Sequence, residues 1–98
     1  MARVVVAQRA SSELANLIQS RHLPTDTRDR VRQSLAQIET FPLVGRRLTG
    51  RWRAFRLIVG PWPWLLLIYL HDTAADTVTV VAVHDARTAA SATSRPYR

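Results

Sequence analysis

The segment between Leu57 and Leu70 limits most strictly what this chain can fold into. It is strongly apolar, but Gly60, Pro61 and Pro63 interrupt it. A membrane-spanning helix needs about 20 predominantly apolar residues in a row, so we expect two buried strands joined by a turn. The second strand, 64–70, is apolar on both faces. That pattern is typical of a central strand covered on both sides.

Further strand patterns, rich in β-branched and aromatic residues, lie at 3–7, 52–59 and 77–84. Between the first two, apolar residues recur at helical spacing over 7–23 and 24–41, and Thr25 or Asp26 is placed to cap the second helix. The order β-α-α-β-β-β predicts an α+β fold, in which a helical hairpin packs on a curved antiparallel sheet. We expect one domain over 1–88. The basic tail, 89–98, is expected to be a disordered arm or a short helix.

Charge is distributed unevenly along the chain. The net charge is +7, and the 14 cationic residues are all arginine. Arginine presents a planar fork suited to phosphate and carboxylate. No acidic residue lies between Glu39 and Asp72, a stretch that holds five arginines: Arg46, Arg47, Arg51, Arg53 and Arg56. We interpret this stretch as an anion-facing patch, with a solvated basic loop and strand edge as the alternative.

Cofactor and membrane sites are not expected. The chain has no cysteine, and its three histidines are scattered, with no carboxylate at metal-ligand spacing. We therefore predict no metal and no cofactor. The start of the chain has too short an apolar run for a secretory signal. We expect a cytoplasmic protein that does not contact a membrane.

Several landmarks over residues 4–88 together resemble the RelE/ParE toxin family. They are a first-helix apolar pattern, a Pro-x-x-Gly junction between helices and sheet, an arginine in the next strand, a strand-terminal tyrosine, and a His-x-x-Arg closing the last strand. In this chain they are Ala10, Leu14 and Ile18; Pro42 and Gly45, followed by Leu48 and Gly50; Arg56; Tyr69; and His84 and Arg87. The resemblance implies the toxin of a bacterial type II toxin–antitoxin pair. Its partner would be a cognate antitoxin with an acidic or amphipathic segment, bound in a heteromeric complex.

The resemblance leaves the target open. RelE-like members cut mRNA in the ribosome, where the RNA's own 2′-hydroxyl attacks the phosphodiester, whereas ParE-like members are described as poisons of DNA gyrase. RelE-like members usually have a strand arginine three residues before the tyrosine; here that position is Leu66. The late tyrosine near Arg87 is also missing. We therefore favour the ParE-like branch and a toxin that binds gyrase. The alternatives are a metal-independent, ribosome-dependent mRNA endoribonuclease and a non-toxic basic nucleic-acid-binding domain, so whether the chain is an enzyme stays open.

If the chain is a nuclease, we predict His84 as general base and Arg56 and Arg87 as phosphate ligands. The alternative makes both arginines structural, bonded to carbonyl groups or to Asp85. Strand alternation puts Arg56, Trp52, Ala54 and Ile58 on one face of the strand at 52–59, and Arg53 with Phe55, Leu57 and Val59 on the other. We expect the apolar face, with Phe55, Leu57 and Val59, to meet the helices, leaving Arg56 and Trp52 on the open side of the sheet.

Three tryptophans are many for a domain of this size. They indicate either a platform on which RNA bases stack or, as we favour, core packing by Trp64 and an exposed protein anchor at Trp62. The predicted residues for binding a target or an antitoxin are Arg46, Arg47, Arg51, Trp52, Arg53 and Trp62.

Overall fold

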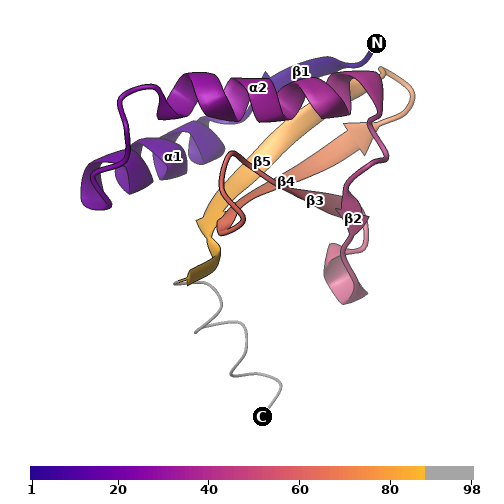
Figure 1. Cartoon of the computed structure of the whole chain (residues 1–98). Helices are drawn as coiled ribbons and strands as arrows, with labels where there is room; N and C mark the ends of the chain where they lie inside the picture. The colour runs from indigo at the N-terminus through magenta and orange to yellow at the C-terminus, as the bar shows by residue number, and fades with distance from the viewer. Residues whose placement is uncertain (88–98) are drawn as a thin grey trace.

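The computed structural model describes residues 1–87 as two helices packed on a five-stranded sheet (Figure 1). The helices are α1 (Gln8–Ser20) and α2 (Thr27–Thr40), and a short 3-10 helix, η1, spans Gly50–Trp52. The strands are β1 (Arg3–Val6), β2 (Arg46–Arg47), β3 (Phe55–Val59), β4 (Leu65–Asp72) and β5 (Thr77–Asp85). The predicted α+β class is confirmed. The predicted tail, 89–98, lies outside the described residues.

The sheet is mixed rather than wholly antiparallel. Its strand order is β1-β5-β4-β3-β2, so β4 is the central strand, as its composition predicted. Strands β2 to β5 pair antiparallel, but β1 pairs in parallel with β5. A parallel pair needs a long connection, and here nearly the whole chain separates the two strands. Strand β2 was not predicted, because two residues are too few to show a period.

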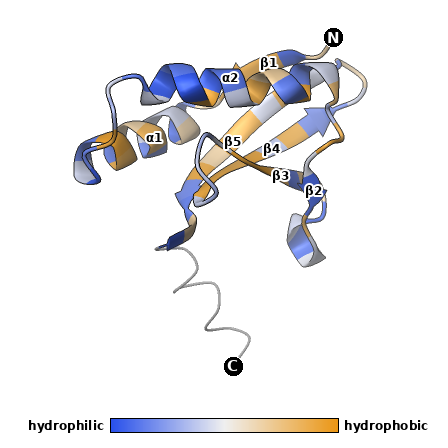
Figure 2. Cartoon of the chain, viewed as in Figure 1, coloured by the Kyte–Doolittle hydropathy of each residue, from blue (hydrophilic) through white to orange (hydrophobic). Residues whose placement is uncertain are grey.

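The core lies between the sheet and the two helices. Alternate residues of β4, namely Leu65, Leu67 and Tyr69, are fully buried on this side. They lie in the same cluster as Leu35 and Ile38 of α2. The intervening β4 residues are only half-buried. The prediction that this strand is covered on both sides therefore holds for one face, and Figure 2 shows that the sheet is largely apolar along β3 and β4. We call the face of the sheet away from the helices the open face.

The predicted orientation of β3 is wrong. Cross-strand partners share a face of the sheet, and Arg56 pairs with Tyr69 while Ile58 pairs with Leu67. Arg56 therefore lies on the helix side, and Phe55, Leu57 and Val59 lie on the open face. Apolar residues occur on both faces of this strand, so alternation alone did not determine which face is covered.

Helix α2 begins without the predicted side-chain cap. Asp26 is the residue before the helix, but its carboxylate accepts a hydrogen bond from Arg30 Nε at 2.9 Å instead of capping. The buried Thr27 hydroxyl donates to the Pro24 carbonyl at 2.6 Å and so fixes the entry turn. Neither this helix nor any other in residues 1–87 has the length and apolar content needed to cross a membrane.

Candidate functional site

His84 lies on the open face, near the end of β5. It pairs across the sheet with Leu66 of β4, which in turn pairs with Val59 of β3. These three side chains form one row, and Leu57, Ile68 and Ala82 form the next. His84 is half-buried. Its imidazole therefore stands at the edge of an apolar surface, where a general base would be partly shielded from water. Leu66, at the position expected for the strand arginine, is its direct neighbour.

The basic stretch forms one edge of the sheet. Arg46 and Arg47 make up β2, and Arg51 and Arg53 lie in and after η1; all four are exposed. Arg46 pairs with Leu57, so it lies on the open face. Arg47 Nε donates to the Arg53 carbonyl at 3.2 Å. No carboxylate of residues 1–87 forms an ion pair with any of these four arginines, so their charge is available to an anionic ligand.

Arg56, a predicted phosphate ligand, holds the junction between the helices and the sheet. Its Nη1 donates to the carbonyls of Leu43 and Gly45, at 3.1 and 3.0 Å. Tyr69 supports the same loop from inside the core: its hydroxyl donates to the Pro42 carbonyl at 2.7 Å and accepts from Gly45 N at 2.9 Å. Burial raises the pKa of Tyr69, so it remains a neutral donor. The bonds of Arg56 are those that the structural alternative expected.

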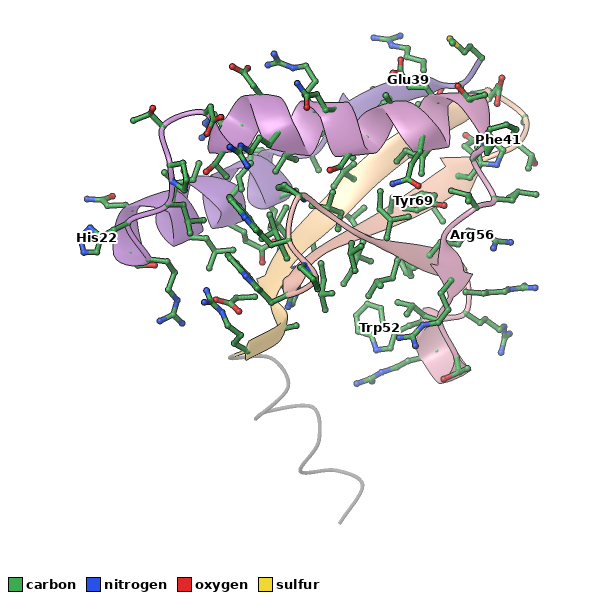
Figure 3. All side chains as sticks on the ribbon, viewed as in Figure 1. His22, Glu39, Phe41, Trp52, Arg56 and Tyr69 are labelled. Atoms are coloured by element: carbon green, nitrogen blue, oxygen red, sulfur yellow. The ribbon has the colours of Figure 1, made fainter. Side chains whose placement is uncertain are left out.

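Figure 3 places Tyr69 beneath α2 and Arg56 at the β2 end of the sheet. The sequence landmarks included Tyr69 and Gly45, but their direct contact was not predicted. A buried tyrosine hydroxyl needs a hydrogen-bond partner, and the nearby Pro-x-x-Gly turn was the signal that could have identified it.

Arg87 is likewise engaged by its own neighbours. Asp85 has a side chain only 2% exposed, and it accepts hydrogen bonds from Arg87 Nε at 3.1 Å and Arg87 Nη2 at 2.9 Å. Arg21 Nε lies 3.4 Å from the same carboxylate. The hydrogen bonds from Arg87 hold the pKa of the Asp85 carboxyl below its usual value, against the opposing effect of burial. Asp85 faces the helix side, so this cluster and His84 lie on opposite faces of β5.

Two tryptophans and two arginines form a continuous stack beside this cluster. The guanidinium carbon of Arg87 lies 3.7 Å from the centroid of the Trp64 ring, and Trp64 stacks on Trp62 at 5.3 Å with an interplanar angle of 2°. Arg30 of α2 lies 5.9 Å from the Trp62 ring. Trp64 packs against the core, as predicted. Trp62 is half-buried and is not the exposed aromatic that the sequence predicted; its role in binding stays a prediction.

Trp52 is the exposed indole instead. It is 54% exposed, contacts Phe55 at a ring distance of 5.7 Å, and has the Arg51 guanidinium 5.9 Å from its own ring. In Figure 3 it lies below β3, on the side away from α2. This placement on the open side agrees with the prediction for Trp52, although the predicted placement of Arg56 beside it was wrong. In the described part of the chain, no three His, Cys, Asp or Glu side chains come together as a metal site.

Glu13 of α1 has a structural role that the sequence did not predict. Strand β1 pairs with β5 only as far as Val80. Beyond that point, a carboxylate oxygen of Glu13 in α1 accepts the hydrogen bond of Val83 N at 2.9 Å. The side chain replaces the missing strand partner, and no sequence motif signals such a contact.

Comparison with known proteins supports the fold. No protein-family model matches the sequence, and no curated protein matches it significantly. The isolated RelE toxin of E. coli superposes with a TM-score of 0.65 at 18% identity, over 97% of this chain and 98% of that one. The chain has the RelE toxin fold. A chain of the intact E. coli RelBE toxin–antitoxin complex superposes with a TM-score of 0.65 at 16% identity, covering 87% of this chain and 96% of that one. A chain of the E. coli DinJ–YafQ toxin–antitoxin complex superposes with a TM-score of 0.60 at 19% sequence identity, covering 89% of this chain and 94% of that one.

These similarities correct the predicted target. The sequence favoured a gyrase poison of the ParE-like branch because Leu66 replaces the strand arginine. The similar structures are RelE and YafQ toxins, so the prediction of a gyrase poison is wrong and the RelE-type alternative is better supported. One missing arginine was weak evidence, since a phosphate can be held by cations from other elements. The RelE fold shown here has Arg46 on the same open face as His84.

Proposed function

We propose that this protein is the toxin of a toxin–antitoxin pair and cuts mRNA in the ribosome. The observation that supports this most directly is a RelE fold with a histidine near one strand end of its open face and, at the β2 edge, four exposed arginines that have no acidic partner among residues 1–87; of the two in β2, Arg46 faces the open side. RelE-like toxins act as ribosome-dependent endoribonucleases. An RNA substrate suits a surface that has cations on its edge and no carboxylate among them.

In the proposed reaction, His84 transfers a proton and arginines bind the phosphates of the RNA. His84 takes the proton of the RNA 2′-hydroxyl, whose oxygen then bonds to the adjacent phosphorus as the bond to the 5′-oxygen breaks. The departing 5′-oxygen takes a proton from water. Arg56 and Arg87 are held by carbonyls and by Asp85, so phosphate binding falls to Arg46, Arg51 and Arg53. Arg46 is three strands across and two residues along the sheet from His84, about 16 Å, so these arginines bind phosphates further along the RNA than the scissile one. This assignment moves the phosphate ligands from β3 and the end of β5 to β2.

The proposed partner is a cognate antitoxin in the bacterial cytoplasm. RelE and YafQ are each known in complex with an antitoxin, RelB and DinJ respectively. An acidic antitoxin segment would match this chain's net charge of +7. An amphipathic one would cover the half-buried apolar residues of the open face. Covering that face would bury His84 and exclude RNA.

The proposal is tested by adding the purified protein to a reconstituted translation system and mapping mRNA 5′ ends by primer extension. The wild type should produce cuts in phase with codons, only when ribosomes are present. His84→Gln should lower the cleavage rate by about 100-fold or more, the usual contribution of a general base. Arg46→Gln should lower it by about 10-fold, consistent with the loss of one charge-assisted hydrogen bond.

Arg32→Gln is the matched control. Arg32 is an exposed arginine on α2, paired only with the exposed Asp29 at 3.2 Å, so its loss should leave cleavage unchanged. Absence of codon-phased cuts in the wild type would disprove the proposal. Equal losses in Arg32→Gln and Arg46→Gln would show that total charge, rather than placement on the open face, governs activity.

A further inference from the structure

The exposed indole of Trp52 has a defined support. Phe55 contacts it at 5.7 Å with ring planes tilted by 56°, and Phe55 itself lies on the open face opposite Leu70. The short helix η1 that holds Trp52 begins at Gly50, whose φ of +65° is a backbone conformation that favours glycine. The indole is therefore in contact with Phe55 on one side, and Trp52 as a residue is 54% exposed.

The charge around Trp52 favours a nucleic acid over a protein as its ligand. Arg51 lies 5.9 Å from the indole, near the outer limit of a cation–π contact, and Arg53 follows directly. An exposed aromatic ring beside cations is the arrangement that single-stranded nucleic acids use, because bases stack on the ring while phosphates bind the cations. Arginine is also common at protein interfaces, but a stretch with five arginines and no carboxylate between Glu39 and Asp72 matches a polyanion better than a protein surface of mixed charge.

We infer that Trp52, supported by Phe55, is a stacking platform for one base of the bound RNA, with Arg51 contacting a neighbouring phosphate. The inference rests on the proposed function, since it assigns a second contact to the same RNA. Phe55 and His84 are separated by four residues along the sheet and two strands across it, which is about 16 Å. The base at Trp52 is therefore not the one beside the scissile phosphate. It lies further along the strand and sets how the RNA enters the site.

The test measures binding separately from cleavage. A fluorescein-labelled single-stranded RNA with 2′-O-methyl sugars cannot be cut by its own 2′-hydroxyl, so its fluorescence anisotropy reports affinity alone. Trp52→Leu should weaken binding by about 10-fold or more, the usual effect of losing one stacked base. Trp52→Phe keeps a ring and should stay within about threefold of the wild type. Arg51→Gln should reduce the slope of log affinity against log salt by about 0.7, the value for one phosphate contact to a single strand.

Phe41→Ala is the matched control, because Phe41 is also an exposed aromatic, at 63%, but lies at the C-terminal end of α2 (Figure 3). It should leave RNA affinity unchanged. Circular dichroism establishes whether each variant is folded. If Trp52→Leu does not fold, a folded Trp52→Phe that loses much more than about threefold in RNA affinity would contradict the platform. Unchanged affinity in Trp52→Leu, or an equal loss in Phe41→Ala, would overturn the inference and assign the indole to a protein contact.

The same variants separate this inference from the proposed function. If the wild type cuts mRNA on the ribosome but binds no free RNA, the proposed function stands and the inference that Trp52 is a stacking platform is wrong. Loss of affinity in Trp52→Leu, in a protein that never cuts mRNA, would support the platform and disprove the endoribonuclease.

Discussion

Gly45 should tolerate no larger residue, because Tyr69 occupies the space where a side chain would lie. A Cβ atom at position 45 would lie 2.6 Å from the Tyr69 hydroxyl oxygen, 2.7 Å from its Cε1 and 3.0 Å from the Leu57 carbonyl oxygen. Distances below 3.0 Å require something to move. Tyr69 is fully buried on the central strand, so its ring cannot swing into solvent. We therefore predict that Gly45→Ala destabilises the fold.

The magnitude follows from two effects. Overpacking of a filled core costs about 1–3 kcal/mol. If the tyrosine shifts, its hydrogen bonds to Pro42 O and from Gly45 N are weakened, at about 1 kcal/mol each. The free energy of unfolding should fall by about 2–4 kcal/mol. For a domain of this size, the corresponding drop in Tm is at least about 8 °C.

A double-mutant cycle checks the proposed cause. Tyr69→Phe alone should cost about 1–3 kcal/mol, because it leaves the Gly45 amide and the Pro42 carbonyl without this partner. Tyr69→Phe removes the hydroxyl oxygen that lies 2.6 Å from the added Cβ atom, although the ring carbon Cε1, at 2.7 Å, remains. Gly45→Ala should then cost about 1 kcal/mol less than it does alone. Urea unfolding followed by circular dichroism measures all four proteins. A cost below about 0.5 kcal/mol for Gly45→Ala, or strictly additive effects, would refute the reasoning.

Three further predictions concern the end of β5. The folded pKa of Asp85 lies below its unfolded value of 3.8, so its contribution to stability is present above that value and lost as pH falls through the folded pKa. The Tm difference between wild type and Asp85→Asn should thus narrow below about pH 4, and a constant difference would contradict this. Glu13→Ala should lower the free energy of unfolding by about 1–3 kcal/mol and speed hydrogen exchange at the Val83 amide. Glu13→Gln keeps an acceptor and should lower it less. Equal exchange rates at Val83 in wild type and Glu13→Ala would exclude the contact. Trp64→Leu removes the ring between Trp62 and Arg87 and should lower the free energy of unfolding by about 1–3 kcal/mol in a denaturant titration; an unchanged midpoint would show that the stack does not stabilise the fold.

The order of the elements and the identity of the central strand were predictable from the sequence. The segment at 64–70 is apolar at every position but is too interrupted upstream to be a membrane helix, so it had to be a covered strand. The helices were recognisable because apolar residues at helical spacing must face a core. The landmarks from Pro42 to Arg87 appear in the order that the RelE/ParE family has them, and the structure has the RelE fold. These features depend on residues close together in the chain, where local rules apply.

The faces and partners of the site were decided by the tertiary structure. A charged residue in a strand suggests an exposed face, but Arg56 lies on the helix side because the loop at 42–45 turns two carbonyls toward its guanidinium. Asp85 was named as an alternative partner of Arg87, but only the structure shows that its carboxylate is buried and that it faces away from His84. The four exposed arginines and Trp52, which lie at the β2 edge of the sheet, were recognisable in the sequence as a basic stretch with an aromatic residue. Only strand register could show that Arg46 shares a face with His84, because register depends on partners far away in the chain.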